Sequence, residues 1–169
     1  MKIRGIIMFA FVVLFVQVFV LNNLSVTPII APMVYIVLLV MMPLDSSQWT
    51  MLGVATALGL VMDITMGTPG LNTLVTLPVA FFRRQILYTL AGFSPMSKEE
   101  GVPLPKRHGM RFHRYAIIMI VIHSVLFYLV EWLSFDNFGM LLLRIFCSTL
   151  LSLLLDYILI ILFMKRLSA

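Results

Sequence analysis

Long apolar runs without charged residues are the feature that most restricts what this chain can fold into. The first run extends from Gly5 to Leu21, and similar runs follow at short intervals. Only 11% of the 169 residues are charged, whereas 62% are hydrophobic, and the mean hydropathy is +1.08. Because a soluble domain carries about 25% charged residues, this composition cannot cover a surface in water. We therefore expect an integral membrane protein with one domain.

The apolar runs are long enough to cross a bilayer repeatedly. About 20 residues per span with short connections allow about six crossings, so the expected fold class is all-α. The second run is the shortest, at about 14 residues, and it lies between Pro28 and Pro43; a re-entrant segment is therefore an alternative there. The expected helices are residues 5–21, 29–42, 50–66, 71–90, 115–133 and 140–164.

The basic residues predict the orientation of these helices. With six crossings, eleven of the twelve lie on the side that carries both termini, and Arg144 lies just inside the last helix on the other side. Five crossings would remove this asymmetry. Since basic residues concentrate in cytoplasmic loops, we expect six crossings with cytoplasmic termini. The eleven are Lys2, Arg4, Arg83, Arg84, Lys98, Lys106, Arg107, Arg111, Arg114, Lys165 and Arg166.

The longest polar connection is the basic segment 91–114. Its prolines and glycines argue against a long stable helix. It either sets the orientation at the lipid surface or docks an anionic or protein partner. Nucleic-acid binding is not expected, because the chain has no soluble basic surface with interleaved aromatic residues. The docking candidates are Lys106, Arg107, Arg111 and Arg114.

The stretch from Gly59 to Thr73 places a carboxylate, Asp63, inside an apolar helix and follows it with a Gly-Pro turn. Small residues share its helix face, which favours close contact with another helix. Asp63 is expected to pack there or to accept from free N–H groups at the start of the next helix; a chemical role is the alternative. The candidates for helix or partner packing are Gly53, Thr56, Gly59, Asp63, Gly67, Pro69, Gly70 and Asn72.

The last helix carries a polar stripe, since Arg144, Ser148, Ser152 and Asp156 are each four residues apart. At 1.5 Å per residue the stripe is about 18 Å long, so its two charged ends cannot pair with each other. Arg144 has two possible partners at similar depth, Glu131 and Asp63. We treat Glu131 and the stripe as an intramembrane polar network. In the preceding helix, His123 is expected to be a hydrogen-bonded structural residue, with a proton relay as the alternative.

No enzyme motif is present. The sequence lacks a nucleophile motif, paired aspartates on neighbouring helices and a phosphate-binding glycine loop. Cys147 is the single cysteine, and the three histidines are not spaced as metal ligands. We therefore expect no enzymatic activity, cofactor or metal.

Two motifs carry a resemblance to a known family. The Pro43-Leu-Asp45 turn and above all the Gly59–Thr73 stretch resemble the rod shape-determining protein MreD family, in its Bacteroidetes-like members. The length, the six expected helices and the basic segment before the fifth are also similar. The resemblance covers nearly the whole chain. It implies a multi-pass protein of the bacterial inner membrane whose fold is similar to substrate-binding subunits of energy-coupling-factor transporters.

The resemblance also implies a function and partners. Such a protein would be a non-enzymatic subunit of the cell-elongation complex that positions lateral peptidoglycan synthesis. It would bind MreC directly and share a complex with RodA, a class B penicillin-binding protein and MreB, while also contacting membrane lipids. The alternatives are a vitamin-binding or other small-molecule-binding subunit of a transporter, and an intramembrane enzyme.

Overall fold

The computed structural model describes residues 3–22, 31–94, 101–131 and 138–167. Within these ranges every regular element is helical, which confirms the expected all-α class. Two of the helices end in a π-helical turn, labelled η. The elements are α1 (Ile3–Phe15) with η1 (Val16–Leu21), α2 (Val37–Val40), α3 (Gln48–Met66), α4 (Leu71–Gln85) with η2 (Ile86–Leu90), α5 (Pro105–His108), α6 (Met110–Glu131) and α7 (Phe138–Leu167).

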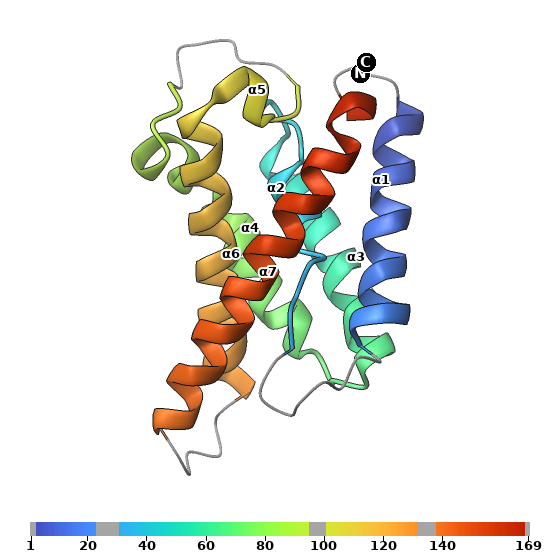
Figure 1. Cartoon of the computed structure of the whole chain (residues 1–169), viewed down its shortest axis with the longest axis vertical. Helices are drawn as coiled ribbons and strands as arrows, with labels where there is room; N and C mark the ends of the chain where they lie inside the picture. Colours follow the sequence, from blue (N-terminus) through green and yellow to red (C-terminus); the bar gives the residue numbers. More distant parts are fainter. Residues whose placement is uncertain (1–2, 23–30, 95–100, 132–137, 168–169) are drawn as a thin grey trace.

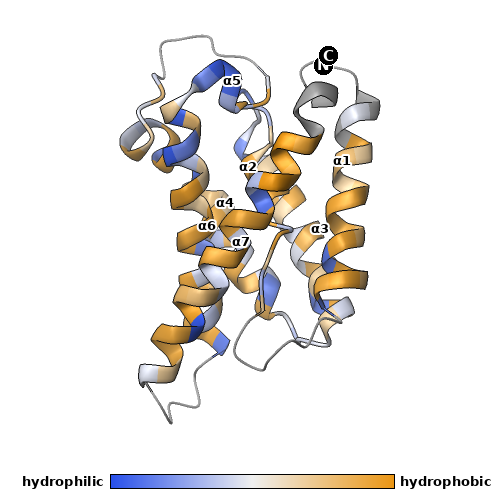
Figure 2. Cartoon of the chain, in the orientation of Figure 1, coloured by the Kyte–Doolittle hydropathy of each residue, from blue (hydrophilic) through white to orange (hydrophobic). Residues whose placement is uncertain are grey.

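The long helices form an antiparallel bundle. In Figure 1, α1, α3, α4, α6 and α7 extend along the long axis; α1 and α3 run in the same direction, and α4, α6 and α7 each run opposite to the long helix before it. Three helical stretches are long and apolar enough to cross a membrane, namely Gln48–Met66, Met110–Glu131 and Gly139–Leu162. Figure 2 shows that apolar residues occupy most of the length of these helices, and many of their large apolar side chains are exposed. Outward-facing apolar side chains are what a lipid environment requires.

The expected helix over residues 29–42 does not form. Residues 31–34 are not helical, and α2 covers only Val37–Val40; residues 29 and 30 lie outside the described ranges. The segment 31–34 passes between α7 and α3 in Figure 1. Pro32 has no N–H to donate, and side chains of other helices take the backbone hydrogen bonds of its neighbours. The expectation of one continuous helix is therefore wrong, and extended chain followed by the short helix α2 takes its place.

The segment 91–114 contains more helix than expected. α5 begins at Pro105, and α6 begins at Met110 instead of near residue 115. Its backbone is tied to the turn before α3, because the Leu44 N–H donates to the Gly101 carbonyl over 2.9 Å. Val102, which belongs to the same segment, is buried. Residues 95–100, and residues 132 and 133 of the expected fifth helix, lie outside the described part of the chain.

The ends of α3 follow from capping. The Ser47 side chain accepts a hydrogen bond from the Thr50 N–H at the start of α3, which is the usual N-cap contact. Gly67 ends the helix with a φ of +67°, in the left-handed region that favours glycine. Gly70 has a φ of +81° and precedes α4. The chain thus reverses direction within a few residues, and α3 and α4 pack together as a hairpin.

Candidate functional site

The Asp63 carboxylate joins the end of α3 to the start of α4. Its Oδ1 accepts from the Asn72 N–H over 2.8 Å, and its Oδ2 accepts from the Thr73 N–H over 3.0 Å. The Thr73 and Thr68 hydroxyls donate to it over 2.7 and 2.9 Å, and the Asn72 amide donates over 3.1 Å. Helix N-termini carry free N–H groups and a partial positive charge. Asp63 therefore caps α4 from the preceding helix.

The same hairpin has one point of very close backbone contact. A Cβ placed on Gly59 would lie 2.5 Å from the Thr73 Cα, so only glycine fits there without movement. Gly53 lies on the exposed part of α3, where an added Cβ would meet nothing within 4 Å. The Thr56 hydroxyl donates to the Leu52 carbonyl of its own helix. Of the expected small-residue face, Gly59 and Asp63 contact α4, whereas Gly53 does not.

A buried hydroxyl extends the polar network from this hairpin to α6. The Tyr35 Oη donates to the Asn72 Oδ1 over 3.2 Å and lies 2.8 Å from the His123 Nε2. It also lies 3.4 Å from the Thr76 Oγ1, and the Thr76 hydroxyl in turn donates to the Asn72 carbonyl. His123 is fully buried. The sequence marks Tyr35 only as one tyrosine in an apolar run, which explains why it is absent from the expected site residues.

Side chains of α6 and α7 hold the extended segment 31–34. The Ser148 Oγ accepts from the Ala31 N–H over 3.2 Å, and the Ser152 Oγ accepts from the Met33 N–H over 2.8 Å. The Tyr128 hydroxyl donates to the Ala31 carbonyl over 2.8 Å. Backbone that is not helical is stable at membrane depth only where protein groups satisfy it. Ser148 and Ser152 thus replace the intrahelical bonds that this segment lacks.

Gln17 of η1 completes this support from the opposite side. Its Oε1 accepts from the Val34 N–H over 2.6 Å, and its Nε2 donates to the Pro32 carbonyl over 3.3 Å. The Gln17 side chain is almost completely buried, so both contacts are shielded from water. Hydrogen bonds from η1, α6 and α7 therefore converge on four successive residues, and the segment connects these helices through its backbone.

The polar stripe of α7 has three different environments. Arg144 lies 3.7 Å from the Glu131 carboxylate at the end of α6, and its guanidinium lies over the Tyr128 ring. Ser148 and Ser152 face the 31–34 segment. Asp156 is buried, and neither of its carboxylate oxygens has a hydrogen-bond partner among the described residues. Of the two partners considered for Arg144, the structure shows Glu131.

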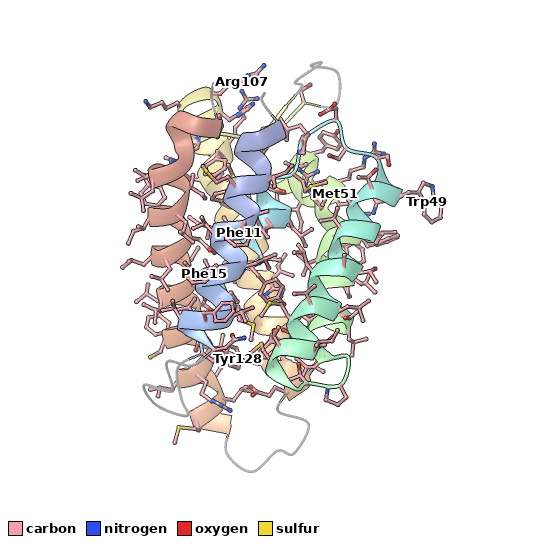
Figure 3. All side chains as sticks on the ribbon, turned by 90° about the vertical axis from the view of Figure 1, so that its right-hand side faces the viewer. Phe11, Phe15, Trp49, Met51, Arg107 and Tyr128 are labelled. Carbon is pink, nitrogen blue, oxygen red and sulfur yellow. The ribbon has the colours of Figure 1, made fainter. Side chains whose placement is uncertain are left out.

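The basic residues at the α5 end divide into one buried group and several exposed ones. Arg83 is only 2% exposed, and its guanidinium donates to the Tyr115 hydroxyl over 2.7 Å and to the Met42 carbonyl over 2.6 Å. It therefore anchors this end of the bundle instead of lying at its surface. Arg111 lies over the Phe93 ring at 5.3 Å and is half-buried. Lys106, Arg107 and Arg114 are exposed. Figures 2 and 3 show the hydrophilic α5 and the Arg107 side chain at this end.

The network is built from hydrogen bonds and contains no cluster suited to a metal. Within the described ranges, no group of three or more His, Cys, Asp or Glu side chains could hold an ion. No protein-family model, curated protein or solved structure matches this chain. The arrangement of its own residues is therefore the basis for the function proposed below.

Proposed function

We propose that this chain is a non-enzymatic subunit of the bacterial cell-elongation complex in the inner membrane, with MreC as its direct partner. It helps to position lateral peptidoglycan synthesis, and RodA, a class B penicillin-binding protein and MreB belong to the same complex. This proposal extends the resemblance of the Gly59–Thr73 stretch to the MreD family. A chain with little polar surface recruits partners through helix faces and short connections.

The hydrogen bonding of Asp63 carries this proposal. Asp63 is the carboxylate of the stretch on which the resemblance rests, and the Thr68, Asn72 and Thr73 groups occupy both of its oxygens. Most of the intramembrane polar groups are used in the same way, to hold the bundle together. A preformed scaffold in which most internal polar groups are hydrogen-bonded suits a protein that binds partners through its outer faces better than it suits a catalyst, which needs free reactive groups.

We further propose six crossings with cytoplasmic termini. The alternation of the helices in Figure 1 supports this topology if the 31–41 stretch counts as the second crossing. Exposed basic residues gather at the α5 end, and Trp49, which is 83% exposed, projects sideways from the half of the bundle nearer to this end in Figure 3. Basic residues favour the cytoplasmic face, and tryptophan favours the membrane–water interface.

Depletion of the protein in its native host tests the proposal. We expect rod-shaped cells to become round, and MreC to co-purify with the full-length chain in mild detergent. An Asp63→Ala variant should reduce this co-purification, because the hairpin loses its cap. An unchanged cell shape together with a new vitamin requirement would contradict the proposal.

One observation favours a small-molecule carrier as the second candidate. A cavity of about 390 Å³ lies between η1 and the end of α3, and the polar residues Asn22 and Thr65 contribute to its lining. Small-molecule pockets usually measure about 300–1,000 Å³ and contain a few polar groups. Uptake of labelled vitamins by cells that overproduce the chain, compared with cells that carry an empty vector, tests this alternative.

A further inference from the structure

A groove between α6 and α7 contains a carboxylate that the bundle itself does not use. The groove has a volume of about 410 Å³, and Asp156 forms part of its wall. Most of the other wall residues are apolar, and His113 and Tyr157 contribute the remaining polar groups. The apolar wall includes Phe112, Ala116, Ile120, Leu153 and Ile160.

The environment of Asp156 differs from those of Arg144, Ser148 and Ser152, the other members of the α7 stripe. Asp156 is 1% exposed, and within the described part of the chain neither carboxylate oxygen has a hydrogen-bond partner. Ser148 and Ser152 have their partners, and Arg144 is about 18 Å away along the same helix. A carboxylate buried without a donor is unfavourable. None of the described residues supplies a donor to Asp156, so a donor from outside them would satisfy this carboxylate.

We propose that this groove binds a transmembrane helix of a partner protein that carries a lysine or arginine at the depth of Asp156. At 1.5 Å per residue, Asp156 lies about 5 Å from the middle of α7. Lipid headgroups remain at the membrane surface, and lipid tails have no donors, so a polypeptide is the source of a cation at this depth. A basic side chain also buries its aliphatic stem against apolar walls while its charged end reaches a carboxylate.

The outer rim of the groove suits a helix as the occupant. Ile117 and Leu154 line the groove and are about half exposed, so they offer apolar contacts to a neighbouring helix. Tyr157 is 46% exposed, and the centre of its ring lies 5.8 Å from that of His113. The Asp156 oxygens are covered in the isolated chain. Binding therefore requires side chains of the groove wall to change rotamer.

The inference rests on the proposed partner-binding role and adds the chemistry of the partner. It is tested with the full-length chain carrying Cys147→Ala and Leu154→Cys, reconstituted in phosphatidylcholine vesicles. The probes are three synthetic leucine-rich transmembrane peptides, each with one cysteine. The first carries a single lysine at the depth of Asp156. In the other two, leucine or glutamate takes the place of this lysine. Disulfide formation with the chain is measured after mild oxidation. Ile158→Cys replaces Leu154→Cys as the control, because Ile158 is exposed but does not line the groove.

We expect the lysine peptide to form about tenfold more disulfide with Leu154→Cys than the leucine peptide does. The Ile158→Cys control should show no such preference. Asp156→Asn should abolish the preference, and Asp156→Lys should transfer it to the glutamate peptide. Equal yields for the lysine and leucine peptides with native Asp156 would overturn the inference, and this comparison does not depend on the folding of an Asp156 variant.

Two further outcomes separate this inference from the proposed function. A tightly bound lipid that co-purifies with the native chain and is lost with Asp156→Asn, together with no peptide preference, would assign the groove to a lipid and overturn the inference. Rounded cells after depletion without a peptide preference would leave the elongation role intact and remove the inference alone. A peptide preference with unchanged cell shape would support the groove and contradict the elongation role.

Discussion

At the scale of single residues, the role of Asp63 depends on the groups that surround it. A lone carboxylate in an apolar helix suggests chemistry, but here it accepts backbone and side-chain donors from the following turn and helix. Capping from the preceding helix was one of the alternatives that the sequence left open. The sequence could not exclude a chemical role, because the direction of the side chain depends on how tightly the turn closes.

Replacement of Asp63 tests this cap. Asp63→Asn keeps the shape of the side chain but removes its charge. It also replaces one of the two oxygens that accept from the N–H groups of Asn72 and Thr73. We expect the free energy of unfolding to fall by about 2–3 kcal/mol, measured by unfolding in mixed micelles with sodium dodecyl sulfate. Asp45→Asn is the matched control, because Asp45 is exposed and its described hydrogen bond, from the Gly101 N–H, is long at 3.4 Å. A similar loss in both variants would contradict a special role for Asp63.

At the scale of helices, the two glycines of α3 have opposite surroundings. Gly59→Ala places a methyl group against the Thr73 backbone, and we expect it to lower the free energy of unfolding by about 1–3 kcal/mol. Gly53→Ala meets open space and should be neutral or stabilising by up to about 1 kcal/mol, because alanine favours a helix. Thermal unfolding in detergent compares the pair. A stable Gly59→Ala variant would show that α3 and α4 are not in close contact.

The extended segment 31–34 is also an element whose stability can be tested. Ser152→Ala removes the acceptor for the Met33 N–H, so we expect a loss of about 1–3 kcal/mol in the free energy of unfolding. Thr149→Val serves as the control on the same helix, because the buried Thr149 hydroxyl has no hydrogen-bond partner in the ranges that the structure describes. The control should not destabilise the chain. Unfolding in mixed micelles measures both, and equal losses would mean that Ser152 does not support the segment.

At the scale of the whole molecule, the proposed topology places the α5 end in the cytoplasm and the α3–α4 turn outside. The chain with Cys147→Ala is combined with either Lys106→Cys or Pro69→Cys, both at exposed positions. In intact spheroplasts, we expect an impermeant maleimide to label the Pro69→Cys chain and to label the Lys106→Cys chain only after lysis. Labelling of both chains before lysis would place the two positions on the same side of the membrane. That result would contradict the single crossing that we expect between them. The reverse pattern would place the termini outside.

The sequence by itself determined the all-α class, the presence of apolar helices long enough to span a membrane and most helix bounds, because apolar length and charge act locally along the chain. Only the tertiary structure showed that residues 31–34 are extended and that Arg83 is buried, because these outcomes depend on hydrogen bonds between residues far apart in sequence. Gln17, Ser152 and Tyr35 each form a hydrogen bond with a group that is distant in the sequence. Burial makes such pairing necessary, and the packing of the helices decides which groups meet.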